Sequence, residues 1–295
     1  HSFSRRQRQM CIRDSSSSVS RESTSISVRF INTEKNLTII SRMLGKMLSN
    51  KDISNETFEL TKESILKNIK ARELDPSSIL SYKSNEEYFA NTNLSHPING
   101  YEENIIKISI DDIKQHLTSL ITQNGIKVSF VGDIDNARAA NYISNLLIDI
   151  PKGHKKFVDM ELNNLNVASK TINFKHDSEQ THISIMIPAV TREDDDFYNL
   201  LVANYILGGS GFGSMLMTEI REKNGLAYSV FSYLMPYKNV GVLKIGMQTA
   251  TNNTKMAINI LNDQLSLFKE FDFDEDKIEA AKLGLIRNFA LRFDT

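Results

Sequence analysis

The chain has 295 residues and a formal net charge of −1, so no global field attracts nucleic acid or an anionic membrane. No apolar run approaches the roughly 18 residues of a membrane span, and no segment has the form of a secretory signal. The single cysteine, Cys11, cannot form an internal disulfide, so cysteine usage assigns no redox compartment.

Residues 1–20 are basic and then serine-rich, with little apolar surface to bury. Such a segment serves as a nucleic-acid or targeting arm in some proteins. We favour a disordered tail, or an artefact, because "RQMCIRDS" resembles translated sequencing-adapter sequence. The chain begins with His1 rather than Met and ends inside a helical pattern, so we expect a fragment.

An internal repeat follows the tail. Segment 53–75 matches segment 273–295 without gaps, and Glu59 and Glu279 are 279 − 59 = 220 positions apart. The preceding segments keep this offset, which predicts a duplicated block of strand, helix, polar loop and second helix. The identical pairs in the matched window are Glu59/Glu279, Lys62/Lys282, Asn68/Asn288 and Arg72/Arg292.

Further elements follow from local patterns. Asp111 and Asp112 begin an acidic first helical turn, and Asp135 or Asn136 is suited to cap the next helix. Alternating apolar residues predict strands at 126–134, 170–176 and 180–190, and a 3.6-residue period predicts a helix at 197–207.

This mixture predicts an α+β fold of two homologous, layered α/β sandwich modules, duplicated at about 220 residues and both truncated. We expect a tail, a C-terminal part of a first module, a linker and an N-terminal part of a second module. These four parts are 1–20, 21–155, 156–168 and 169–295.

The glycine-rich stretch "GGSGFGSMLMTEIREKNGLAYSV", residues 208–230, raises the question of phosphate binding. A P-loop needs Lys and then Ser or Thr after its last glycine, but Ser214 and Met215 follow Gly213. A dinucleotide fingerprint fails as well, because the loop follows a helix and position 214 is Ser. We therefore interpret the loop as a flexible, tightly turning helix–helix connection in which glycine supplies unusual dihedrals, with a nucleotide site as the alternative.

Two other residue patterns are candidate sites. His176 and His182 would share a face of a continuous strand, where a metal site and ordinary strand positions are both open interpretations. Arg221 falls in the last turn of a predicted helix that Gly225 ends, and Tyr228 lies on the strand that follows. A guanidinium and a phenol that converge there are suited to grip a peptide carbonyl or a developing oxyanion.

The 208–230 stretch resembles the signature of the pitrilysin/insulinase/mitochondrial-processing-peptidase metallopeptidases, or inverzincins, in their bacterial two-module branch. Supporting similarity runs from about residue 24 and includes "LSHPINGYEENIIKISIDDI" and "EQTHISIMIPAVTREDDDFYNLLVANYILGG". The resemblance implies paired α+β modules around a zinc that an HxxEH motif and a later Glu bind for peptide hydrolysis. This sequence has no HxxEH.

The resemblance assigns roles to three residues. Glu59 matches the third zinc ligand, but only if an HxxEH lies upstream in the parent chain. Arg221 and Tyr228 match the family's Arg/Tyr pair, which contacts substrate and supports the transition state. We therefore expect the zinc-less partner subunit of a metalloendopeptidase, inactive alone, with a parent chain that carries both halves of the site as the alternative.

The resemblance also implies partners. The zinc would lie on a homologous subunit in a heterodimer, or the parent would form a homodimer, and the substrate would be a peptide. The compartment would be the bacterial periplasm or cytoplasm. The alternative is a non-catalytic assembly or peptide-binding module, like the core subunits that this fold supplies to respiratory complexes.

Overall fold

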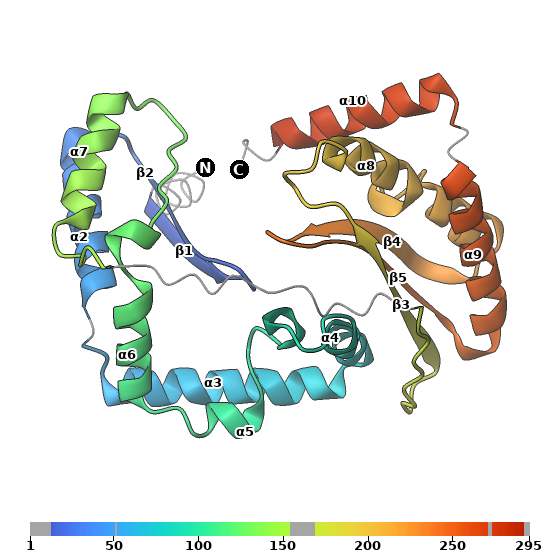
Figure 1. The fold of residues 1–295 in the computed structure, drawn as a ribbon, viewed down its shortest axis with the longest axis horizontal. Coiled ribbons are helices and arrows are strands. Elements are labelled where there is room, and N and C mark those ends of the chain that lie inside the picture. Colours follow the sequence, from blue (N-terminus) through green and yellow to red (C-terminus); the bar gives the residue numbers. More distant parts are fainter. Residues whose placement is uncertain (1–12, 51, 154–168, 271–272, 292–295) are drawn as a thin grey trace, which may run out of the picture. The chain divides into compact units, whose positions relative to one another are not determined.

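The computed structural model describes residues 13–50, 52–153, 169–270 and 273–291 (Figure 1). These residues form two compact units. Unit 1 lies within residues 13–70 and 98–153, and unit 2 within residues 71–97 and 169–291. The predicted linker, 156–168, lies outside the described residues, and the predicted module boundaries stay predictions.

Unit 1 begins with a hairpin of β1 (Arg13–Val19) and β2 (Thr24–Phe30), closed by the Ser20 N–H donating to the Ser23 carbonyl at 2.8 Å. Residues 13–19 of the expected tail therefore form a strand, and residues 1–12 lie outside the described residues. A ladder is built from backbone groups, so a serine-rich strand pairs when its neighbour is anchored. Val28 and Phe30 of β2 provide this anchor by packing on the unit's core.

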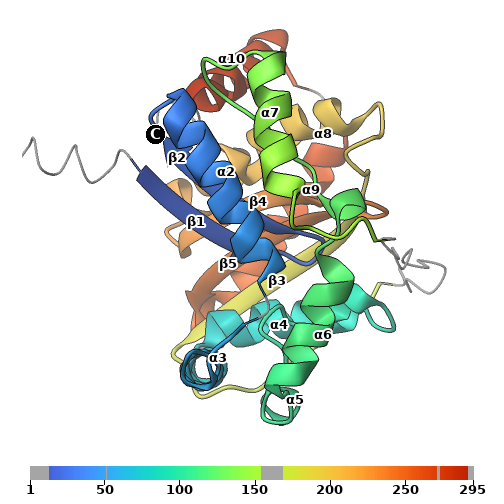
Figure 2. The same ribbon diagram turned by 90° about the vertical axis from the view of Figure 1, so that its left-hand side faces the viewer.

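Helices α2 (Glu34–Ser49) and α7 (Asn136–Leu147) pack side by side over that core (Figure 2). Gly45 faces the Leu146 backbone so closely that a Cβ there would collide with the carbonyl group. Asp135 caps α7 by accepting from the Arg138 N–H at 2.8 Å, which confirms one of the two predicted caps. The buried core residues are Leu37, Ile40, Tyr142 and Leu146.

Unit 1 also contains α5 (Glu102–Ile105) and α6 (Ile110–Leu120), while α3 (Asn55–Leu74) crosses the division between the units. Ser109 and Asp112 form a reciprocal capping box at the start of α6, where the sequence predicted an acidic first turn. The short 3-10 turn η2 (Gln123–Gly125) also lies in unit 1, whereas η1 (Asn93–Ser95) and η5 (Thr251–Asn253) lie in unit 2.

Two predicted strands are wrong. Segment 126–134 packs Val128 and Phe130 on the core while Lys127 and Ser129 stay exposed, but no described strand pairs with it. Segment 170–176 is likewise not a strand. Alternation sets which side chains face the core, whereas a strand also needs a neighbouring backbone as its partner.

Unit 2 is built on the antiparallel sheet β3 (Gln180–Ala189), β5 (Gly241–Ala250), β4 (Ala227–Pro236), in that order. Its central strand β5 is buried on both faces. Leu243, Ile245 and Met247 face a core that α9 (Thr254–Glu270) and η4 (Met217–Lys223) complete. Val242 faces the other layer, which contains α4 (Pro76–Tyr88) and η1. There Val242 clusters with Phe89, the residue that follows α4.

The remaining helices of unit 2 are α8 (Phe197–Asn204), η3 (Tyr205–Gly209) and α10 (Glu275–Leu291). The fold is α+β, as predicted. Helices α2 and α9 begin 254 − 34 = 220 positions apart, and α3 and α10 begin 275 − 55 = 220 apart. These bounds agree with the repeat offset, and the duplication itself stays a prediction.

Helix α4 depends on its N-cap. The Asp75 carboxylate accepts from the Ser78 N–H at 2.8 Å, and hydrogen bonds from Ser78 hold the pKa of Asp75 below its usual value. Because the folded-state pKa is lowered, this contribution to stability is present above the unfolded pKa. It is lost as the pH falls through the folded pKa.

We therefore predict that Asp75→Ala lowers the free energy of unfolding by about 1 kcal/mol at neutral pH, the usual loss for an N-cap. The difference from the parent chain should shrink on acidification. Asp75→Asn is the matched control, since it keeps an acceptor oxygen but does not titrate. Urea unfolding across the acid range measures both, and a gap independent of pH would contradict the prediction.

Candidate functional site

The candidate site is centred on the junction between η4 and β4. Gly225 adopts φ +61°, and its N–H donates to the Arg221 carbonyl at 2.9 Å. This left-handed residue ends the helix as the sequence predicts. The Leu226 N–H then donates to the Ile220 carbonyl at 2.9 Å, so the chain turns directly into the strand.

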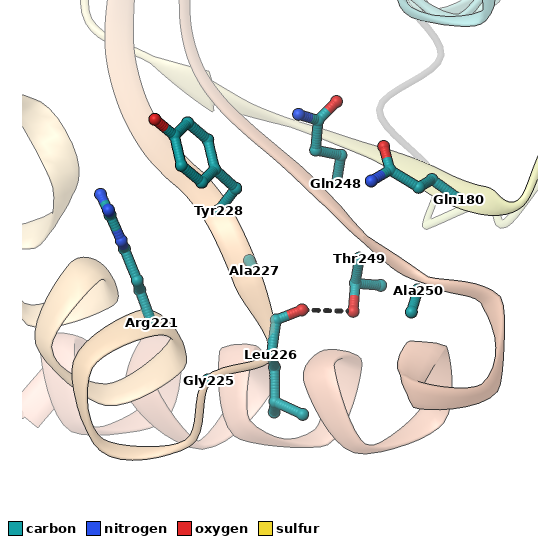
Figure 3. Close-up of a pocket in the computed structure, with 9 residues that line it drawn as sticks. All are labelled: Gln180, Arg221, Gly225, Leu226, Ala227, Tyr228, Gln248, Thr249 and Ala250. Carbon is teal, nitrogen blue, oxygen red and sulfur yellow. Dashed lines mark hydrogen bonds between the residues drawn. The ribbon is translucent and has the colours of Figure 1, made fainter.

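The first residues of β4 are held by the neighbouring strand. The buried Thr249 hydroxyl donates to the Leu226 carbonyl at 2.6 Å (Figure 3). Ala227 pairs with Thr249 and Val230 pairs with Met247, so two β4 residues oppose the single residue Gln248. This is a β-bulge, a device that redirects side chains and is common beside active sites.

The bulge directs Tyr228 outward, and its side chain is 76% exposed. The Arg221 guanidinium carbon lies 4.9 Å from the centre of the Tyr228 ring. The predicted convergence of these two side chains is therefore confirmed (Figure 3). Their contact is between the cation and the ring, which leaves the phenolic oxygen available.

Sequence reasoning missed Phe212. Its ring centre lies 4.7 Å from the Arg221 guanidinium carbon, so that Phe212 and Tyr228 both contact the cation. The glycine loop places Phe212 there, with Gly211 and Gly213 both at positive φ. One signal was present in the sequence, because Phe212 is the only large side chain among the loop's glycines.

Other contacts hold the loop in place. A Cβ on Gly208 would lie 2.7 Å from the Ser232 backbone nitrogen, so the loop begins pressed against β4. Ser214 is buried, and its hydroxyl donates to the Gly211 carbonyl at 2.7 Å. The conclusion that glycines here supply unusual dihedrals is confirmed by the three positive φ angles at 211, 213 and 225.

A pocket of about 420 Å³ opens at this junction. Gln248 of β5 and Gln180 of β3 lie on the side across from Arg221 (Figure 3). Arg221 is the single charged residue among its lining residues. The lining residues are Gln180, Arg221, Gly225, Leu226, Ala227, Tyr228, Gln248, Thr249 and Ala250.

Several polar side chains in the pocket are unpartnered. Among the described residues, no hydrogen bond or ion pair involves the side chains of Arg221, Tyr228, Gln180 or Gln248. Arg221 supplies only donors, each glutamine supplies donors and an acceptor, and the phenol does both. With no carboxylate among the described lining residues, the pocket is suited to an uncharged or anionic ligand rich in acceptors, such as a peptide backbone.

The other predicted site residues are not among the residues that line this pocket, although His182 of β3 pairs with the lining residue Gln248 of β5. Glu59 is exposed on α3, in unit 1. In the parts of the chain that the structure describes, no group of three or more His, Cys, Asp or Glu side chains could hold a metal ion. His176 and His182 belong to no such group among the described residues.

No helix among the described segments is both long and apolar enough to cross a membrane.

Comparison with known proteins gives concordant results. Residues 107–285 match the family model described as "Peptidase M16 inactive domain". The "Non-peptidase homolog YmxG" of Helicobacter pylori is 28% identical over 85% of the chain, and the "Uncharacterized zinc protease YmxG" of Bacillus subtilis is 24% identical over 81%. The matched part spans 58% of each of these relatives.

A solved structure agrees with the fold. The "peptidase M16 inactive domain from Pseudomonas fluorescens" superposes with a TM-score of 0.83 at 19% sequence identity. The match covers 93% of this chain and 66% of that one. The family-model match confirms the resemblance noted in the sequence, and the solved structure shows the shared fold.

We predict that Gly225→Ala destabilises the chain by roughly 1–2 kcal/mol, because a Cβ strains the left-handed backbone although no atom lies in its way. Gly225→Asn is the matched comparison, since Asn tolerates this conformation better and should lose less. Urea unfolding measures both. Equal losses for Ala and Asn would show that backbone strain at this junction is not the cause.

Proposed function

Since the chain belongs to the peptidase M16 family, we propose that it contributes the peptide-binding half of a metalloendopeptidase site. Arg221 and Tyr228 hold the substrate backbone in this proposal. The observation that carries it is the Arg221 guanidinium at the edge of a pocket. It contacts two aromatic rings and has no hydrogen-bond or ion-pair partner among the described residues.

The chemistry of the cation supports this role. Rings packed near a guanidinium occupy its faces, while its N–H donors point outward in its own plane. A peptide carbonyl is a good acceptor for these donors. During hydrolysis this carbonyl oxygen gains negative charge, so a positive group beside it binds the transition state more tightly than the substrate.

Tyr228 adds a second donor. Its phenolic O–H is exposed and directed by the bulge, and no described side chain accepts from it. Gln180 and Gln248, across the pocket, each offer an amide that matches the N–H and C=O of one peptide unit. An extended peptide is thus the ligand class that the lining residues favour.

The zinc half of the site lies elsewhere in this proposal. A zinc-bearing homologous subunit supplies the metal in a heterodimer, with zinc present in the assembled enzyme. Glu59 acts as a ligand only where an upstream HxxEH completes the set, in which case the parent pairs as a homodimer. The 295-residue chain is inactive alone in either arrangement.

A second candidate function is a non-catalytic peptide-binding or assembly module. It is favoured by the family description "inactive domain" and by the Helicobacter pylori relative's name, "Non-peptidase homolog". This candidate uses the same pocket and the same ligand class. It differs in one outcome, because peptide would be bound but not cleaved, even beside a zinc-bearing partner.

For the peptidase, we predict that Arg221→Ala or Tyr228→Phe lowers peptide turnover by the assembled complex on the order of 10²–10³-fold, with zinc content unchanged. Tyr228→Phe keeps the ring and removes only the O–H. Lys223→Ala is the matched control, since Lys223 lies on the same helix, pairs with Glu219 and does not line the pocket.

Turnover of a quenched fluorescent peptide library and zinc analysis of the purified complex supply the two readouts. Normal turnover in both site variants would sink the peptidase proposal. If the wild-type complex binds the library but never cleaves it, and Arg221→Ala abolishes that binding, the non-catalytic candidate is correct instead.

A further inference from the structure

We propose that Phe212 is a positioning residue, whose ring holds the Arg221 guanidinium against Tyr228 so that its donors face the pocket. The inference rests on the proposed peptide-binding role of Arg221. It also assigns a purpose to the glycine loop, which carries Phe212 to this place. The name aromatic clamp is used below for Phe212, Arg221 and Tyr228.

The exposure of Phe212 indicates that core packing does not hold its ring in place. The Phe212 side chain is 71% exposed, and it belongs to none of the hydrophobic core clusters among the described residues. A phenylalanine this exposed gains little from burial. Its 4.7 Å approach to the guanidinium carbon is the contact that accounts for its position.

The geometry of the clamp uses two chain segments. Phe212 comes from the loop before η4, and Tyr228 comes from the strand after it. Arg221 lies between them in sequence and in the last turn of η4. The helix is π-wound there, a winding often found at functional sites, and its neighbour Ile220 is fully buried.

The glycine loop makes contacts on both sides of Phe212. Gly208 is pressed against the Ser232 backbone, and the Ser214 hydroxyl bonds the Gly211 carbonyl at the far end of the loop. These two contacts lie on either side of Phe212 along the chain. A long Arg side chain otherwise samples many rotamers, and contact with a held ring reduces the number that remain.

The two rings limit the directions from which a ligand can reach the Arg221 guanidinium. With rings against the guanidinium of this lining residue, we expect ligand acceptors to approach its N–H edge. Loss of the Phe212 ring should leave the positive charge of Arg221 in place but allow its guanidinium to adopt more orientations. We therefore expect weaker peptide binding, by about two- to fivefold, rather than the complete loss expected when the cation itself is removed.

The first arm of the test uses the full chain without ligand. In ¹H–¹⁵N spectra, the Arg221 Nε–Hε signal should show a ring-current shift. Phe212→Leu should remove part of that shift, and Phe212→Tyr should keep it. Tyr198→Leu is the matched control, since Tyr198 is an exposed aromatic residue of unit 2 that pairs with Phe197. An unchanged Arg221 signal in Phe212→Leu would overturn the clamp.

The second arm measures affinity for fluorescein-labelled β-casein, an unfolded polypeptide probe. We expect Phe212→Leu to bind it about two- to fivefold more weakly, with recovery in Phe212→Tyr. A lost ring-current shift with unchanged affinity would overturn the positioning role. If Arg221→Ala binds the probe normally, the proposed peptide-binding function fails. The spectrum of the free chain still decides the clamp in that case.

Discussion

The hydrogen bond from the Thr249 hydroxyl to the Leu226 carbonyl is the interaction on which the candidate site depends. It joins the residue that leaves η4 to the central strand of the sheet, next to the left-handed Gly225. Arg221 lies on the helix side of this junction and Tyr228 on the strand side. A fixed junction gives these two side chains a fixed relation, although they come from elements of different type.

The hydrophobic core of unit 2 packs against this junction. Leu226, which precedes β4, Val230 of β4 and Ile220 of η4 are buried in the cluster that also contains Met247. Arg221 follows the buried Ile220, and the bulge turns Tyr228 outward although Leu226 and Val230 on either side of it are buried. The site is the outer surface of a well-packed layer, which suits side chains that must be held for a ligand.

Local signals in the sequence predicted much of this arrangement. The cap of α7 at Asp135, the capping box at Ser109 and Asp112, and the left-handed Gly225 each follow from neighbouring residues alone. The change from helix to strand at Gly225 is also local, and it predicts that Arg221 and Tyr228 lie near one another. A single sequence carries signals of this kind because they involve only residues a few positions apart.

Features that depend on distant residues were not predicted. Alternation at 126–134 fixed the packed face but not a pairing strand, and the serine-rich β1 gave no sign of its partner β2. The bulge at Tyr228 arises from the register against β5. The Phe212 ring meets Arg221 only after the loop folds back, so a spacing of nine positions gave no indication of the contact.

The central claim is that Arg221 and Tyr228 act as one unit on a bound peptide. A double-mutant cycle for β-casein affinity, using Arg221→Ala, Tyr228→Ala and both together, measures this directly. The account predicts a coupling free energy of about 0.5–3 kcal/mol, as for residues in contact. Losses that add to within about 0.3 kcal/mol would mean that the two residues act independently, which contradicts the account.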